Sequence, residues 1–143
     1  MAIILTQTDT TVGLLSQDEM ELYRAKSRDI QKPFLKVFDS FSTFKKDTLR
    51  IPKSQKKFVR RSKRTTFVVK NKAFRVAKLP LHSSFLRELS WHYSTSANKA
   101  GESFSREFTQ EIADIVVENE KGLYEAPSSK LYKINAKKRV RLR

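Results

Sequence analysis

The chain has 143 residues, 38% of them apolar, and 30 Lys and Arg against 15 Asp and Glu give it a formal charge of +15. The absence of cysteine excludes disulfides and thiolate metal sites, and two histidines are too few for a histidine-rich site. A chain of this length is expected to form one domain, over residues 1–143. No apolar run approaches the roughly 20 residues of a membrane span, so we expect the protein to be cytoplasmic.

The positive charge predicts an anionic partner, because a field of this strength concentrates nucleic acid and nucleotide phosphates near the protein. An excess of lysine can also serve solubility alone. The charge by itself therefore names no function.

A strand and a helix are predicted at the start of the chain. The apolar residues 2–5 indicate a strand that leads into a hydroxyl-rich loop at 6–11. Ser16 and Glu19 have the spacing of a capping box, which predicts a helix that ends near residues 26–28.

An extended run and a second helix should follow. Residues 34–38 are expected to be extended after Pro33, and Asp39 or Ser40 is expected to cap a short helix. The basic segment 53–64 is compatible with an amphipathic helix or with a loop, and the pattern does not decide between them.

The middle of the chain predicts a hairpin, a helix and a loop. The runs 65–69 and 73–77 are expected to be antiparallel strands because they are rich in β-branched and aromatic residues. Pro80 suits the start of a helix through Trp91, with leucines and a phenylalanine at helical spacing. Composition predicts a loop for the polar stretch 94–98.

The last third predicts a helix, a strand and a closing hairpin. Ser105 is expected to cap a helix through Ile112, and residues 115–117 are expected to form a strand. The runs 131–134 and 140–143 flank a turn-like segment, so they predict a hairpin.

Three segments carry side chains suited to a small polar ligand and to phosphates. Hydroxyls at 8–14 can orient a polar substrate, and those at 94–98 can bond phosphate oxygens or a ribose. Lys26 and Arg28 lie two residues apart, so in an extended segment both point the same way and can neutralise one triphosphate. The alternatives are a solvated pair of cations and an ordinary loop.

The order of these segments resembles the YrdC-like family of threonylcarbamoyl-AMP synthases, of which the chain would be a shortened member. Ser62, Lys63 and Arg64 stand where that family has a Pro-Gly-Pro turn. The matching segments, in chain order, are 8–14, 26–28, 65–68, 74–76, 94–98 and 127–129.

The resemblance implies an α/β (α+β) fold: a single YrdC-like domain whose twisted, mixed parallel and antiparallel sheet is flanked by helices and forms a concave basic surface. It implies an L-threonylcarbamoyladenylate synthase that uses ATP, L-threonine and bicarbonate in tRNA threonylcarbamoyladenosine modification. ATP would be a substrate of the protein, and Mg2+ is the metal expected with it. The implied partners of the protein are tRNA or other structured RNA and other tRNA-modification proteins. Lys26 and Arg28 would act by positioning and charge stabilisation, without a covalent nucleophile.

The resemblance also implies which residues bind the substrates. Threonine would be bound by Thr10, Arg75, Ser94 and Ser128, and Ser129 is an alternative to Ser128 in this role. Arg143 is likewise an alternative to Arg141 as the C-terminal arginine at the nucleotide. The residues implied at ATP are Lys26, Arg28, Thr65, Ser96, Asn98 and Arg141.

Two other functions stay open. The first is a non-catalytic double-stranded RNA or tRNA-binding module of the same fold, and the second is a basic ribosome- or assembly-associated protein. An enzyme should make an AMP-linked product only with all three substrates, whereas a binding module should show salt-sensitive RNA affinity without turnover.

Overall fold

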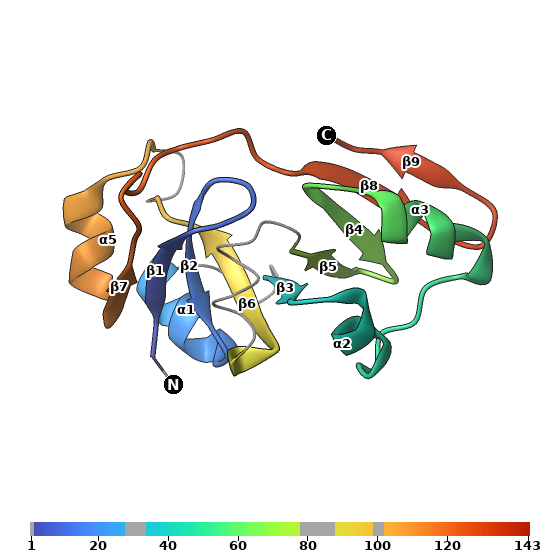
Figure 1. Ribbon diagram of the computed structural model, residues 1–143, viewed down its shortest axis with the longest axis horizontal. Coiled ribbons are helices and arrows are strands. Elements are labelled where there is room, and N and C mark those ends of the chain that lie inside the picture. The colour runs from blue at the N-terminus through green and yellow to red at the C-terminus, as the bar shows by residue number, and fades with distance from the viewer. Residues whose placement is uncertain (1, 28–33, 78–87, 99–101) are drawn as a thin grey trace.

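The structure is a computed structural model that describes residues 2–27, 34–77, 88–98 and 102–143. The strands of these residues form one twisted, mixed sheet in the order β7-β1-β2-β6-β3-β5-β4-β8-β9 (Figure 1). Three neighbouring pairs are parallel, β1 with β7, β3 with β5 and β4 with β8, and the others are antiparallel. The expected mixed sheet is therefore confirmed. The strands are β1 (Ile4–Gln7), β2 (Val12–Ser16), β3 (Leu35–Phe38), β4 (Thr65–Val69), β5 (Lys72–Val76), β6 (Trp91–Ser96), β7 (Ile115–Val117), β8 (Lys130–Ile134) and β9 (Arg139–Arg141).

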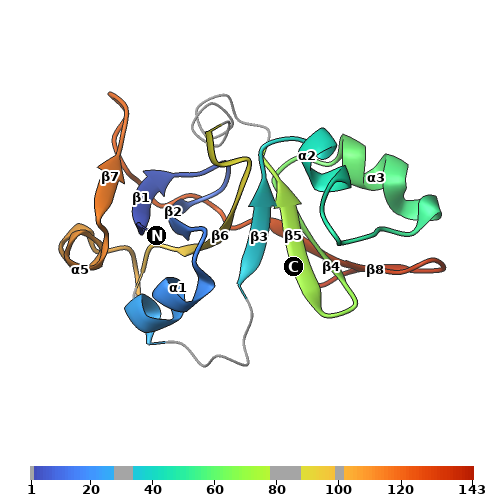
Figure 2. The same ribbon diagram turned by 90° about the horizontal axis from the view of Figure 1, so that it is seen from below.

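Short helices flank the sheet, and none within the described ranges is long and apolar enough to cross a membrane. They are α1 (Glu19–Lys26), α2 (Phe41–Lys45), the 3-10 turn η1 (Lys53–Gln55), α3 (Lys56–Arg61) and α5 (Arg106–Ile112). The basic segment that allowed either a helix or a loop thus contains η1 and α3. Figure 2 shows α1 and α5 near one end of the sheet and α2 and α3 near the other.

The sheet has two halves, which join where β3 pairs with β6. The β1 half comprises β7, β1, β2 and β6 with α1 and α5, and its core is mainly aliphatic, with Leu5, Leu14 and Leu22 completely buried. The β4 half comprises β3, β5, β4, β8 and β9 with α2 and α3, and its core is rich in phenylalanine. Stacked rings such as Phe44 and Phe74, with centroids 4.5 Å apart, fill that second core.

Two of the predicted helix caps are confirmed, and one is wrong. Ser40 caps α2 and Ser105 caps α5, each with its hydroxyl accepting a backbone N–H of the first turn. Ser16, however, belongs to β2, where it is paired with β6, and Asp18 takes its place by accepting the N–H of Met20 at 3.0 Å.

Two polar segments differ from the expectation. Residues 94–96 are not a loop but the end of β6, because this strand lies between β2 and β3 and bonds both. Trp91 begins that strand rather than ending a helix. Of the rest of the expected helix, residues 88 and 89 are helical as predicted, and residues 80–87 fall outside the described residues. Lys26 is the last residue of α1 and not part of an extended segment; Ser27 caps the helix in the left-handed region, with φ 49°.

Candidate functional site

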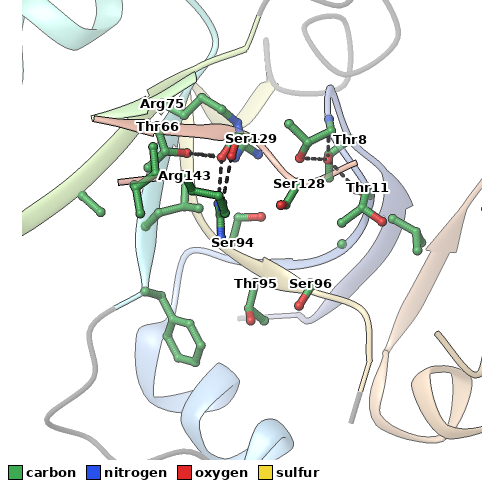
Figure 3. Close-up of a pocket in the computed structure, with 17 residues that line it drawn as sticks. Thr8, Thr11, Thr66, Arg75, Ser94, Thr95, Ser96, Ser128, Ser129 and Arg143 are labelled. Carbon is green, nitrogen blue, oxygen red and sulfur yellow. Dashed lines mark hydrogen bonds between the residues drawn. The ribbon is translucent and has the colours of Figure 1, made fainter. Parts of the chain in front are cut away.

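A cavity of about 300 Å³ lies at the junction of the two halves (Figure 3). Residues of β2, β6 and the loop between β1 and β2 form one wall, and residues of β4, β5 and the C-terminal segment form the other. Hydroxyl groups dominate the lining, and the charged groups among the described lining residues are Arg75 and Arg143. The hydroxyl residues are Thr8, Thr10, Thr11, Thr66, Ser94, Thr95, Ser96, Ser128 and Ser129.

A buried ion pair connects the two halves at the cavity. Arg75 Nε of β5 donates to Asp9 Oδ1 of the β1–β2 loop at 3.0 Å, and the side chains are only 4% and 1% exposed. Burial lowers the pKa of Arg75, the positive charge of Arg143 lowers it further, and Asp9 opposes both effects. Because the two guanidinium groups repel each other, an anion in the cavity would relieve their repulsion.

A polar network holds Arg143 beside the cavity (Figure 3). The hydroxyls of Thr66 and Ser129 are 2.7 Å apart. Arg143 donates from Nε to the Ser129 carbonyl at 3.0 Å and from Nη2 to the Ser129 hydroxyl at 3.3 Å. Since the Arg143 residue is exposed, its charge lies beside the cavity within reach of a ligand.

The hydroxyl-rich loop between β1 and β2 folds tightly on itself. Thr8 Oγ1 accepts the N–H of Thr10 at 3.1 Å and donates to the Thr11 carbonyl. A Cβ at Gly13 would lie 2.8 Å from the Thr8 methyl group and 3.3 Å from the Thr95 carbonyl. A side chain at this position would crowd Thr8 and the Thr95 carbonyl, so glycine lets the loop pack closely on this part of the sheet.

Lys26, Ser96 and Asn98 also come together. Lys26 Nζ donates to the Ser96 carbonyl at 2.9 Å and to the Asn98 carbonyl. Ser96 Oγ donates to Asn98 Oδ1 at 2.5 Å. Ser96 lines both the cavity and an adjoining hollow that Asn98 also lines, so Lys26 fixes the backbone at this edge of the site.

The residues expected to bind threonine and those expected to bind ATP are placed differently. Thr10, Arg75, Ser94 and Ser128 all line the cavity. Among those expected at ATP, Ser96 lines it, Lys26 and Asn98 lie at its edge, and Arg28 lies outside the described residues.

Two expected ATP residues do not line the cavity. Thr65 donates to the Lys63 carbonyl at 2.8 Å and lines a hollow beside α3, whereas its neighbour Thr66 lines the cavity. Arg141 lies in β9 opposite Tyr132, and Arg143 is the arginine that reaches the cavity. The side chains of successive strand residues point to opposite faces of the sheet, so only one of Thr65 and Thr66 can face the cavity. This alternation could have selected Thr66 from the sequence.

Similarity to known proteins assigns the chain to a family. A family model that names Sua5, YciO and YrdC, described as telomere recombination, matches residues 2–140. The chain belongs to the Sua5/YciO/YrdC family. No curated protein is significantly similar to this chain in sequence.

Solved structures of the family share the fold. Sua5 of P. abyssi complexed with L-threonine is 16% identical with a TM-score of 0.78, and the match covers 99% of this chain and 50% of that one. E. coli YciO is 16% identical with a TM-score of 0.77, over 99% and 82% of the two chains. Full-length HypF in its phosphate- and nucleotide-bound form is 19% identical with a TM-score of 0.76, over 99% and 26%. The chain thus spans about half the length of that Sua5.

Proposed function

We propose that this chain is an L-threonylcarbamoyladenylate synthase that uses ATP, L-threonine and bicarbonate for threonylcarbamoyladenosine modification of tRNA. The observation that carries the proposal is the hydroxyl-lined cavity with Arg75 and Arg143 beside each other. The Sua5 relative with bound L-threonine and the HypF relative with bound nucleotide support this choice of ligands. The cytoplasm stays our prediction for its location.

The cavity suits the groups of threonine. Arg75 already bonds Asp9 and Thr66, so the more exposed Arg143 is the cation that would pair with the threonine carboxylate. Thr10, Ser94 and Ser128 would bond the ammonium and hydroxyl groups, because each hydroxyl can donate and accept.

ATP would bind next to threonine, toward Ser96 and Asn98. Lys26 would position this edge through the Ser96 and Asn98 carbonyls, with Arg28 supplying further charge. Thr66 takes the role first expected of Thr65, whereas the role first expected of Arg141 at ATP is not carried over, because Arg143 is assigned to the threonine carboxylate.

Mg2+ would accompany the triphosphate rather than bind a site made by the protein. Within the described ranges, no group of three or more His, Cys, Asp or Glu side chains could hold a metal ion. We expect phosphate oxygens and waters to supply most of its ligands, as is usual for Mg2+ bound with a nucleotide.

The chemistry requires no protein nucleophile. The threonine amine adds to bicarbonate and water leaves, which gives N-carboxythreonine. An oxygen of the new N-carboxy group then attacks the α-phosphorus of ATP, the bond from this phosphorus to the oxygen that bridges to the β-phosphorus breaks, and pyrophosphate departs. The protein would contribute by orienting the reactants and by neutralising the charge on the phosphates.

Titration calorimetry with L-threonine tests the binding step. Arg143→Ala should weaken binding at least tenfold, since a hydrogen bond to a charged group is worth about 1.5–3 kcal/mol. Lys137→Ala is the control, because it removes the same charge from an exposed side chain outside the cavity lining. No threonine binding by the unmodified chain, or equal losses in both variants, would reject this site.

A further inference from the structure

The charge of the chain is divided unevenly along the sequence. Segments 48–87 and 126–143 contain 20 of the 30 Lys and Arg residues and none of the 15 Asp and Glu residues. The rest of the chain contains 10 basic and 15 acidic residues, so the whole positive excess belongs to these two segments.

The described residues of the two segments meet in the β4 half of the molecule. They supply η1, α3, β4, β5, β8 and β9, which lie together at one end in Figure 1, far from α5 and β7. The sequence places no carboxylate side chain within them, so these elements carry many exposed cations and no acidic side chains of their own.

Direct contacts join η1, α3 and the β8–β9 hairpin into one surface. Gln55 Nε2 donates to the carbonyls of Asn135 and Lys138 at 3.0 and 3.2 Å, and Gln55 Oε1 accepts from Arg139 Nε at 3.1 Å. The rings of Phe58 and Tyr132 are 5.0 Å apart.

The register of the hairpin directs its cations toward α3. Arg141 lies opposite Tyr132 and Arg139 lies opposite Ile134, and directly paired residues share one face of a sheet. The Arg139 guanidinium lies 3.7 Å from the centre of the Phe58 ring, which confirms this side. Lys130 also shares it, two residues before Tyr132.

A groove of about 290 Å³ lies between α3 and β8 within this surface. Its lining combines the aromatic rings of Phe58 and Tyr132 with the cations Arg61, Lys63 and Lys130. Aromatic rings next to cations are the pattern by which proteins hold an unpaired base and its phosphate.

The groove also leads toward the cavity. Lys130 lines both the groove and a hollow of about 400 Å³ that Arg64, Thr8 and Ser128 line as well. Thr8 and Ser128 in turn line the cavity. The backbone of a nucleic acid lying along α3 would therefore lead toward the proposed adenylate site.

We propose that α3 and the β8–β9 hairpin bind RNA, with backbone phosphates on the cations and one unpaired base in the groove against Tyr132. The alternation of aromatic and basic groups favours a nucleic acid over an acidic protein, which offers no bases to stack. This inference does not depend on adenylate chemistry in the cavity, since its residues lie outside the threonine site.

Fluorescence anisotropy with a labelled RNA hairpin that carries a single-stranded tail tests the surface. Binding should weaken with salt, and Arg61→Ala with Lys63→Ala should lower the slope of log affinity against log salt by about 1.5, because each lost phosphate contact contributes about 0.7–0.9. Arg24→Ala with Lys121→Ala removes the same charge from exposed positions of the acidic remainder, and its slope should not change. No salt-dependent binding, or equal changes in both double variants, would overturn the proposal.

Two further arms test the groove and the choice of partner. Tyr132→Leu should weaken binding of the tailed hairpin about tenfold and leave a blunt duplex unaffected, because only an unpaired base can stack. Equal losses on both RNAs would overturn the groove assignment, and thermal unfolding checks that the variant folds. Polyglutamate at equal charge should compete poorly; if it competes as well as RNA, the partner is an acidic polymer in general.

Discussion

The two halves of the sheet differ in what fills them and in what covers them. The β1 half has a core with buried leucines at its centre, whereas the β4 half is packed with phenylalanine rings. The surplus of positive charge belongs to the segments that build most of the β4 half. The cavity uses both halves, hydroxyls mainly from one and guanidinium groups from the other. We therefore propose that the substrates bind at the junction of the two halves and that RNA binds at the basic end.

The largest effect that we expect is the loss of stability when a ring is removed from the aromatic core of the β4 half. Phe74 is fully buried, stacks on Phe44 and packs at a tilt against Phe67, so Phe74→Ala should lower the free energy of unfolding by about 3–5 kcal/mol. Leu14→Ala is the counterpart in the β1 half, with about 2–5 kcal/mol. Both should shift one common transition in chemical denaturation, because β3 and β6 are hydrogen-bonded into a continuous sheet. Two separate transitions would show that the halves unfold independently.

The next effect concerns the ion pair between the halves. Asp9→Ala should cost about 3 kcal/mol, because it leaves the buried guanidinium of Arg75 without its carboxylate. The double variant Asp9→Ala with Arg75→Met should recover part of that loss, since no buried charge remains. Chemical denaturation of the single and double variants measures both values. A double variant less stable than the single one would show that the pair stabilises more than its separation from water costs.

The parts of the fold that depend on neighbouring residues could be predicted from the sequence, and those that depend on distant contacts could not. The strands at 65–69 and 115–117 and the caps Ser40 and Ser105 were predictable, because β-branched runs and first-turn hydroxyls depend on near neighbours. Residues 94–96 were not, since only pairing with two distant strands makes that polar run a strand.

The candidate site was partly predictable for the same reason. The family motifs selected Thr10, Arg75, Ser94 and Ser128, which line one cavity. They could not select Asp9, whose role follows from a contact with a residue 66 positions away.

A smaller effect separates the edge of the site from the basic end. Lys26→Ala should weaken ATP binding about tenfold, because the Ser96 and Asn98 carbonyls lose their shared donor. Lys53→Ala removes the same charge from an exposed position at the start of η1, where screening leaves little effect on a nucleotide. ATP titration of both variants and of Arg28→Ala makes the comparison. Equal losses at Lys26 and Lys53 would mean that bulk charge alone attracts ATP.

The smallest effect is a pH dependence inside the β4 half. Burial alone would raise the pKa of Asp47, but hydrogen bonds from Lys36, at 2.6 Å, and from the Leu49 N–H lower it below 3.8. A carboxylate with a lowered folded-state pKa stabilises the fold above its ordinary pKa, and the contribution is lost as pH falls through the lowered value. Asp47→Asn should therefore remove part of the stability difference between pH 6 and about pH 3, by less than about 1 kcal/mol. An unchanged pH profile of the denaturation midpoint would contradict this.

The central claim is that the junction of the two halves makes threonylcarbamoyl-AMP. The direct measurement incubates the chain with ATP, L-threonine, bicarbonate and Mg2+ and detects AMP-linked product by mass spectrometry, with each reactant omitted in turn. We predict product only in the complete mixture, together with pyrophosphate, and strongly reduced product with Arg143→Ala but not with Lys137→Ala. No product in the complete mixture, from a chain that is folded and binds RNA, would contradict the claim and leave an RNA-binding module of the same fold.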